Sequence, residues 1–168
     1  MVRYALTGTP GTGKTTISKL LDQNIIVLSD YYKDFSEGKS ESGEWIIDID
    51  KIKKNISIIE DSILEGHFAH EFDNIDKIIV LRCDPNILVE RLKKRGYTKE
   101  KVRENLEAEA IGTIYSESLE LLGPKDVVQL DTSSNKATES AQILKDYING
   151  NIKLEEQIDY SERILDWY

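Results

Sequence analysis

The sequence predicts an α/β domain in which a parallel sheet is covered by helices, and two observations carry this prediction. Short apolar runs typical of strands alternate with helical stretches along all 168 residues. A glycine-rich loop joins the first of these runs to the first helical stretch. A chain of this length, with 39% hydrophobic residues, is expected to fold as one domain over residues 1–168.

The glycine-rich loop from Gly8 to Thr15 reads Gly-Thr-Pro-Gly-Thr-Gly-Lys-Thr, which fills every position of the phosphate-loop pattern. Glycines let successive backbone N–H groups point at a phosphate, and the following helix adds its positive end. Lys14 is expected to reach the β- and γ-phosphates, and the Thr15 hydroxyl to hold magnesium. A Gly/Thr-rich turn could match by chance, but a strand-like run before it and a helical stretch after it agree with the motif. The sequence therefore predicts a P-loop fold that binds a nucleoside triphosphate with Mg²⁺.

Four further strand-like runs follow, each a short continuous apolar segment of the kind buried in a parallel sheet. They cover residues 25–28, 62–65, 77–82 and 127–130. Residues 30–47 are rich in charge, serine and glycine and show no period, so we expect a mobile insertion there.

Helices are expected where apolar residues recur at helical spacing behind a start signal. Asp48 precedes isoleucines at helical spacing, and Asp84 with Pro85 is a strong helix start that runs to Gly96. A long helix is expected from Thr98 to about Leu122, before Gly-Pro. The remaining helices are expected at residues 137–148 and, as an amphipathic C-terminal helix, at 152–168.

Charge and composition exclude several classes of protein. The net charge of −9 argues against non-specific nucleic-acid binding and favours small molecules, or a basic partner such as a ribosomal protein. The chain has no Asn-Lys-x-Asp motif of GTP switches and is short for an ATPase motor. The single cysteine, Cys83, fits a reducing interior, and no apolar run approaches 18 residues; because the phosphate loop starts by Gly8, we expect no signal peptide. We expect a cytoplasmic protein without membrane contact.

Small kinases need a lid that closes on the triphosphate, and two arginines fit this role. Arg91 and Arg95 are four residues apart, so they share one helical face. Guanidinium groups neutralise the charge that spreads over a transferring phosphoryl group. The alternative is a solvated basic face near a helix C-terminus, which also favours cations. Spacing alone does not choose between the two.

Two more clusters lie where parallel strands end. Glu65 and His67 follow the third strand, where a carboxylate can hold magnesium and ligands gather. His67 and His70 could form a zinc pair or be surface histidines in a loop, and no nearby cysteine completes a zinc site. Lys33, beside two tyrosines after the second strand, could pair with an acceptor phosphate while the rings stack on a base.

Taken together, these segments resemble the atypical adenylate kinases of archaea and eukaryotic nuclei, also described as assembly ATPases of the small ribosomal subunit. The resemblance covers most of residues 1–150. It is carried by Gly8 to Thr16, Asp48-Ile49-Asp50, Glu65-Gly66-His67, Leu81 to Asp84, Arg91 to Tyr97, Lys101 to Asn105, Glu107 and Glu109.

The resemblance implies a core of five parallel strands, a nucleoside-monophosphate-kinase-like architecture and a short lid at residues 91–98. It implies phosphoryl transfer from Mg-ATP to AMP, some ATPase activity, and binding of ribosomal protein uS11 during maturation of the small subunit and its rRNA. We expect a monomer whose segment 30–60 binds the acceptor nucleotide.

The site residues implied by the resemblance fall into four groups. They are Gly11, Thr12, Gly13, Lys14, Thr15, Thr16 and Arg95 for ATP; Lys14, Arg91, Arg95 and His67 for catalysis; Lys33, Asp30, Asp50 and His67 for the acceptor; and Thr15 and Glu65 for the metal. The chain departs from the family in three places: Glu65 replaces the aspartate of eukaryotic members, Lys33 replaces a frequent arginine, which gives up bidentate phosphate pairing, and residues 34–47 match poorly.

Overall fold

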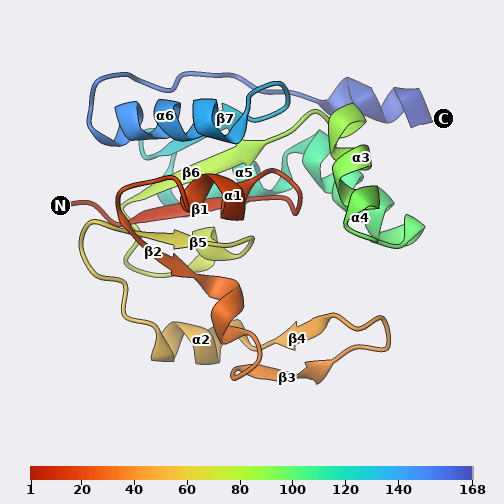
Figure 1. The fold of residues 1–168 in the computed structure, drawn as a ribbon, viewed down its shortest axis with the longest axis horizontal. Coiled ribbons are helices and arrows are strands. Elements are labelled where there is room, and N and C mark those ends of the chain that lie inside the picture. The colour runs from red at the N-terminus through yellow and green to blue at the C-terminus, as the bar shows by residue number, and fades with distance from the viewer. Residues whose placement is uncertain (168) are drawn as a thin grey trace.

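A computed structural model describes residues 1–167, and its centre is the predicted parallel sheet of five strands (Figure 1). The spatial order is β2-β5-β1-β6-β7, and every neighbouring pair in it is parallel. The α/β fold class is therefore confirmed. The strands are β1 (Tyr4–Gly8), β2 (Asn24–Val27), β5 (Ser62–Glu65), β6 (Lys77–Arg82) and β7 (Val127–Asp131).

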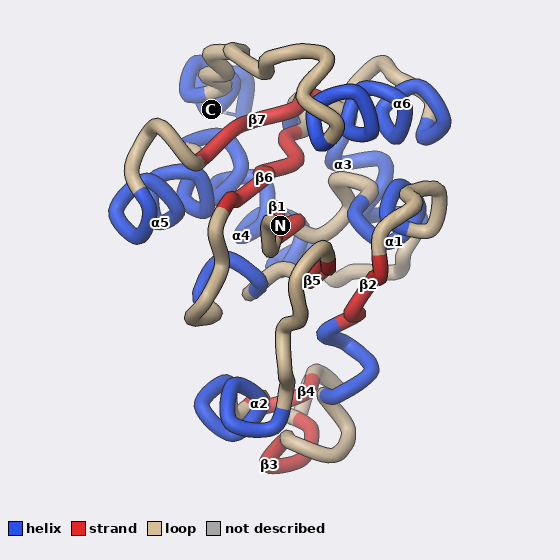
Figure 2. Tube along the Cα trace, turned by 90° about the vertical axis from the view of Figure 1, so that its left-hand side faces the viewer, coloured by secondary structure: helices blue, strands red, loops and turns tan. Residues whose placement is uncertain are grey.

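Helices cover both faces of this sheet (Figure 2). One face packs against α1 (Lys14–Ser18) and α6 (Ala137–Ile148), and the other against α5 (Thr113–Leu122) and the 3-10 turn η2 (Ala69–Glu71). The remaining helices are α2 (Ile49–Asn55), α3 (Pro85–Lys94), α4 (Lys99–Ile111) and the 3-10 turns η1 (Leu28–Tyr31) and η3 (Ser161–Trp167). Across residues 1–167, no helix combines the length and the apolar character that crossing a bilayer requires.

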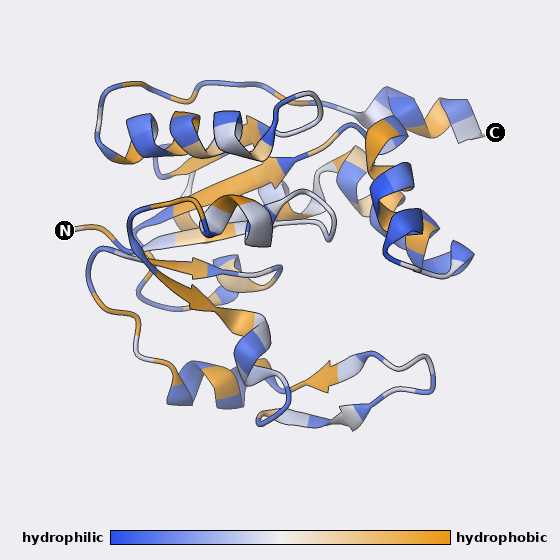
Figure 3. Cartoon of the chain, viewed as in Figure 1, coloured by the Kyte–Doolittle hydropathy of each residue, from blue (hydrophilic) through white to orange (hydrophobic). Residues whose placement is uncertain are grey.

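Alternation along the central strands explains the two cores. Tyr4 and Leu6 of β1 point into the core under α1 and α6, whereas Ala5 between them points into the core on the opposite face. All five residues of the strand are buried, so both of its faces pack against apolar side chains, and Figure 3 shows that the central strands are largely hydrophobic. The helix starts are also as expected, because Asp48, Asp84 and Thr98 each accept a backbone hydrogen bond as the N-cap.

The long helix expected from Thr98 to Leu122 is wrong in one respect, since the chain forms two helices there. Gly112 lies between α4 and α5 in the left-handed conformation, with φ 68° and ψ 40°. The positive φ favours glycine, and the buried Arg82 guanidinium lies beside the turn, where its Nη2 donates to Glu109 O in the last turn of α4 at 2.8 Å. The helical period of the sequence does not reveal this break.

Residues 30–47, expected to lack regular structure, form the end of η1 and a small antiparallel hairpin. Its strands are β3 (Ser36–Lys39) and β4 (Trp45–Ile47). Gly43 N donates to Ser40 O at 2.9 Å in the turn, and the Lys39 ammonium lies 4.6 Å from the Trp45 ring centroid. β3 is polar and mostly exposed, and β4 is apolar but only three residues long, so the segment shows no apolar alternation.

The C-terminal helix expected over residues 152–168 is also wrong in extent. Residues 153–160 have no regular secondary structure, η3 covers Ser161–Trp167, and Tyr168 lies outside the described residues. The segment runs along β7 instead, where the Glu156 carboxylate accepts a hydrogen bond from Asp131 N at 3.1 Å. Polar groups of this segment therefore form hydrogen bonds with β7 rather than within a helix.

The packing behind β5 yields a stability prediction at Gly66. A Cβ there would lie 2.8 Å from two side-chain carbons of the buried Leu28, although the backbone φ of Gly66 is not positive. Gly66→Ala should therefore lower the free energy of unfolding by about 1–3 kcal/mol through overpacking alone. Urea unfolding measures this difference, with the exposed-site variant Ser57→Ala as control. An unchanged unfolding midpoint in Gly66→Ala would show that Leu28 moves aside freely.

Candidate functional site

The phosphate loop leaves the buried end of β1 and turns sharply into α1, and its glycines are required by close approaches. Gly8 has φ +146°, and a Cβ there would lie 2.6 Å from the carbonyl oxygen of Leu81. At Gly11, with φ +90°, a Cβ would lie 2.8 Å from Leu88 Cδ1. A side chain at either position would displace the loop from β6 or α3. The two glycines therefore allow the loop backbone to pack directly against β6 and α3.

Lys14 lies inside the curl of this loop. Its ammonium donates to Gly8 O at 2.7 Å and to Thr9 O at 3.0 Å, and the side chain is buried. Burial lowers the pKa of Lys14 to about 8, an effect that nearby Glu65 partly opposes. The group is thus held where an anion would be bound, and its charge can be titrated near neutral pH.

A cavity of about 360 Å³ opens beside the loop, on the side of α3 and α6, and we call it the donor cavity. Arg91 borders it and donates to Gly11 O at 3.3 Å and to Thr132 O at 2.7 Å. These bonds fix the loop to the end of β7. The lining residues are Gly11, Thr12, Gly13, Thr16, Ile17, Arg91, Lys94, Arg95, Thr132, Asn135, Ala137 and Ser140.

Glu65, at the end of β5, faces the same loop from the neighbouring strand. Its Oε2 is buried and has no hydrogen-bond partner among residues 1–167. Burial raises the pKa of this carboxyl group, while Lys14 and a hydrogen bond with Thr15 oppose that shift. A carboxylate oxygen without a protein partner, beside a threonine hydroxyl, is a donor set that suits a hard cation such as Mg²⁺. The residues present therefore fit the metal that the phosphate loop implies.

A second cavity, of about 530 Å³, lies on the other side of the loop, and we call it the acceptor cavity. His67 borders it with its ring stacked on Phe68, at 4.2 Å between centroids. Burial, reinforced by the charge of Lys14, lowers the pKa of His67 to about 4, so the ring is neutral at pH 7. The lining residues are Pro10, Tyr32, Glu44, Trp45, Ile47, His67, Phe68, Tyr97, Lys101, Glu104 and Asn105.

Three residues predicted for the acceptor lie elsewhere. Lys33, Asp30 and Asp50 are exposed and line neither the donor nor the acceptor cavity. The cation that borders the acceptor cavity is Lys101, which pairs with Glu44 at 3.3 Å. The three predicted contacts would need a movement of segment 30–60, and they stay predictions.

Of the two alternatives for the histidines, the one that places both in a surface loop is wrong for His70. This ring is buried, with Nδ1 at 3.0 Å from Thr7 Oγ1 and Nε2 at 2.8 Å from Glu117 Oε2. The 3-10 turn η2 points the side chain inward between β1 and α5. His67 and His70 therefore face different surroundings, and they do not form the pair that their spacing suggested.

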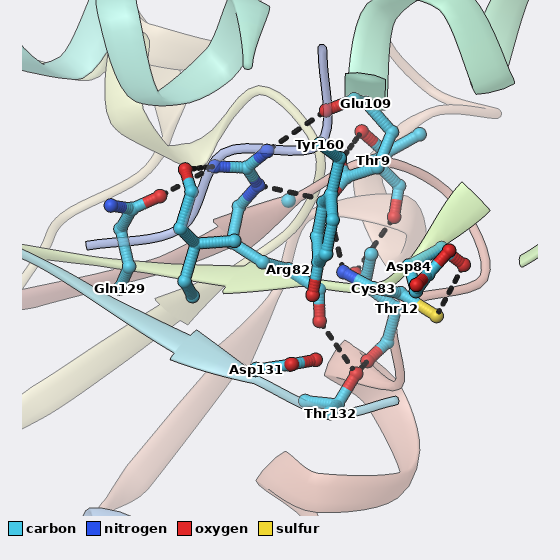
Figure 4. A network of polar contacts seen from close by, with 12 residues as sticks. Thr9, Thr12, Arg82, Cys83, Asp84, Glu109, Gln129, Asp131, Thr132 and Tyr160 are labelled. Atoms are coloured by element: carbon cyan, nitrogen blue, oxygen red, sulfur yellow. Dashed lines mark hydrogen bonds and ion pairs between the residues drawn. The ribbon is translucent and has the colours of Figure 1, made fainter. Parts of the chain in front are cut away.

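The loop is also held by a buried ion pair (Figure 4). Arg82 Nε donates to Glu109 Oε1 at 2.8 Å, and both side chains are almost fully buried. Glu109 Oε2 accepts a hydrogen bond from the Thr9 hydroxyl at 2.6 Å. Arg82 also donates to Gln129 Oε1, and its guanidinium lies 5.5 Å from the Tyr160 ring centroid. The network joins the phosphate loop to β6, α4, β7 and the C-terminal segment.

Several cavity residues were missed by sequence reasoning. Thr132 and Asn135 border the donor cavity, and Thr132 Oγ1 donates to Thr12 O at 2.7 Å. They follow the end of β7, so the rule that ligands gather at the carboxyl ends of parallel strands could have found them. Trp45 borders the acceptor cavity from the hairpin, and no motif marked it.

Comparison with known proteins agrees with this geometry. The AAA domain family matches residues 5–112. A protein named "putative adenylate kinase" from Methanocaldococcus jannaschii is 36% identical over 177 aligned residues, which cover 99% of this chain and 97% of that protein. A protein of the same name from Thermococcus kodakarensis is 37% identical over an alignment that covers 94% of this chain and 92% of that protein.

Among solved structures, the shikimate kinase of Acinetobacter baumannii superposes with a TM-score of 0.54 over 90% of this chain and 94% of its own. At 13% identity, this similarity concerns the fold alone. The archaeal relatives extend over nearly the whole chain at more than a third identity. The chain therefore belongs to the adenylate-kinase-like family that carries this AAA domain.

Proposed function

We propose that this protein is an adenylate kinase, which transfers a phosphoryl group from Mg-ATP to AMP. One observation carries the proposal: the two cavities share the phosphate loop as a wall. Pro10 borders the acceptor cavity, whereas the next residue, Gly11, borders the donor cavity. Two nucleotides placed on opposite sides of one loop would bring their phosphates together at its rim. A hydrolase would need only the first cavity.

On the donor side, the loop from Gly11 to Thr16 binds the triphosphate through its backbone N–H groups and Lys14. Arg95 borders the cavity and supplies charge to the transferring phosphoryl group. Arg91 first positions the loop through Gly11 O and joins Arg95 when the lid at residues 91–98 closes. Thr15 and Glu65 would hold Mg²⁺, which when bound supplies positive charge to the β- and γ-phosphate oxygens.

On the acceptor side, the neutral His67 ring accepts or donates a hydrogen bond at the rim of the cavity and places the acceptor phosphate. Tyr32 and Trp45 offer rings for stacking on a base, and Lys101 offers a cation. Lys33, Asp30 and Asp50 belong to the same proposal only if segment 30–60 closes over the nucleotide. The names of the archaeal relatives support adenine nucleotides as the substrates.

We also propose a second activity, in which ATP hydrolysis changes the affinity for the basic ribosomal protein uS11 during maturation of the small subunit and its rRNA. Two observations support it. The net charge is −9, and the C-terminal segment contacts Arg82, which is linked to Thr9 of the phosphate loop by two hydrogen bonds that meet at Glu109. A change in the loop can thus reach the surface. For this role we expect a monomer in the cytoplasm.

The kinase proposal predicts a stoichiometry. The pure protein with Mg-ATP and AMP should form two ADP for each AMP consumed, and Lys14→Ala should lower kcat/KM roughly a hundredfold or more, because the triphosphate loses its main cation. Quantifying ATP, ADP, AMP and phosphate by ion-exchange chromatography measures both. The exposed Lys125→Ala serves as the control. Formation of ADP and free phosphate at a rate indifferent to AMP would contradict the proposal.

The position of Lys14 predicts a pH dependence. Below its pKa of about 8 the free protein carries the ammonium charge, and above it the charge is lost, so kcat/KM for ATP should fall roughly tenfold per pH unit above about 8. Bound phosphate favours the charged form, so kcat should decline only at higher pH. In Lys14→Arg the decline of kcat/KM should disappear, because guanidinium stays protonated. If kcat/KM of Lys14→Arg falls in the same way above pH 8, a group other than Lys14 causes the pH dependence.

The assembly proposal predicts a nucleotide-dependent complex. Binding of purified uS11 should differ roughly tenfold or more between the protein with a non-hydrolysable ATP analogue and with ADP, because only a differential affinity can act as a switch. Isothermal titration in both states gives the two constants. Equal constants would leave the kinase proposal intact and remove the switch.

A further inference from the structure

We propose that His70, Glu71 and Glu117 form a binding site for a divalent transition-metal ion, separate from the nucleotide site. One ligand atom from each side chain lies within 4.8 Å of the other two. His70 and Glu71 come from η2, and Glu117 comes from the middle of α5. The three residues also border a cavity of about 170 Å³ between these elements.

The hydrogen bonds around Thr7 decide which nitrogen of His70 carries a proton. Thr7 has one hydroxyl hydrogen, and it donates to the carbonyl oxygen of His67 at 3.1 Å. The same hydroxyl oxygen lies 3.0 Å from His70 Nδ1, so Nδ1 must be the donor of that second bond. The other nitrogen, Nε2, then presents its lone pair away from β1.

This lone pair faces a carboxylate. Glu117 Oε2 lies 2.8 Å from His70 Nε2, and two acceptor atoms at that distance repel unless a cation lies between them. A second proton would suffice for this pair alone. Glu71 places a second carboxylate oxygen within the same 4.8 Å, which a proton shared by His70 and Glu117 does not require. A metal ion can use all three donors.

The donor set indicates the kind of ion. One imidazole and two carboxylates suit Zn²⁺ and related ions such as Co²⁺, whereas Mg²⁺ and Ca²⁺ prefer oxygen alone. The Nδ1 bond to Thr7 is the outer contact that orients metal-binding histidines. The adjoining cavity leaves room for a water ligand, as in zinc sites with three protein ligands. The ion would tie α5 to the loop that carries His67.

The test uses chelator-treated full-length protein without nucleotide or Mg²⁺, titrated with Co²⁺ alone. The wild-type protein should develop a visible absorption band, and added Zn²⁺ should abolish it by displacement. Glu117→Gln should weaken Co²⁺ binding roughly tenfold or more, and because Glu117 is half-exposed the variant is expected to fold. Zn²⁺ should raise the Tm of the wild type and leave that of Glu117→Gln unchanged.

Two controls make the outcome decisive. Glu120→Gln alters an exposed carboxylate on the same helix and should bind Co²⁺ like the wild type. Glu65→Gln removes the carboxylate near the phosphate loop and should also keep the band, which separates this site from the magnesium site. Absence of a band in the wild type, or equal binding by Glu117→Gln, would overturn the proposal and leave a proton between His70 and Glu117.

Discussion

The buried ion pair between Arg82 and Glu109 is the contact on which the arrangement of the site depends. Taking two charges out of water costs several kcal/mol for each ion, and such a pair persists only where further hydrogen bonds satisfy both partners. Here Glu109 accepts from Arg82, from Cys83 N and from Thr9, and Arg82 donates to Gln129 and to Glu109 O. The position of the phosphate loop is thus set by strands and a helix far away in sequence.

The strand order explains why two cavities meet at this loop. From β1 the chain first builds β2 and β5 on one side, then crosses to β6 and β7 on the other. The crevice at such a reversal opens at the carboxyl end of β1, where ligands bind in open α/β sheets. Glu65 and His67 reach it from β5, and Thr132 reaches it from β7. Topology therefore brings together residues that no motif unites.

The sequence predicted the sheet, the phosphate loop and most helices, because these follow from local period and capping residues such as Asp48 and Asp84. It did not predict the break at Gly112, where the backbone takes the left-handed conformation beside the Arg82 guanidinium of β6. It did not mark Trp45 and Lys101 at the acceptor cavity, since their positions depend on how the hairpin and α4 fold towards the loop. The sequence left His70 open between a metal pair and a surface position, because a spacing of three residues does not reveal a 3-10 turn that points inward.

The course of the C-terminal segment has a consequence for the behaviour of the molecule in concentrated solution. β7 is an outer strand of the sheet, and such a strand can recruit strands from other molecules. The Glu156 carboxylate accepts a hydrogen bond from Asp131 N, and the Glu156 carbonyl oxygen lies 3.5 Å from Gln129 Nε2. A charged segment without regular secondary structure therefore covers this edge of the sheet. The stretch around Glu156 thus takes up positions on β7 at which another chain could pair, and its removal would expose an open sheet edge.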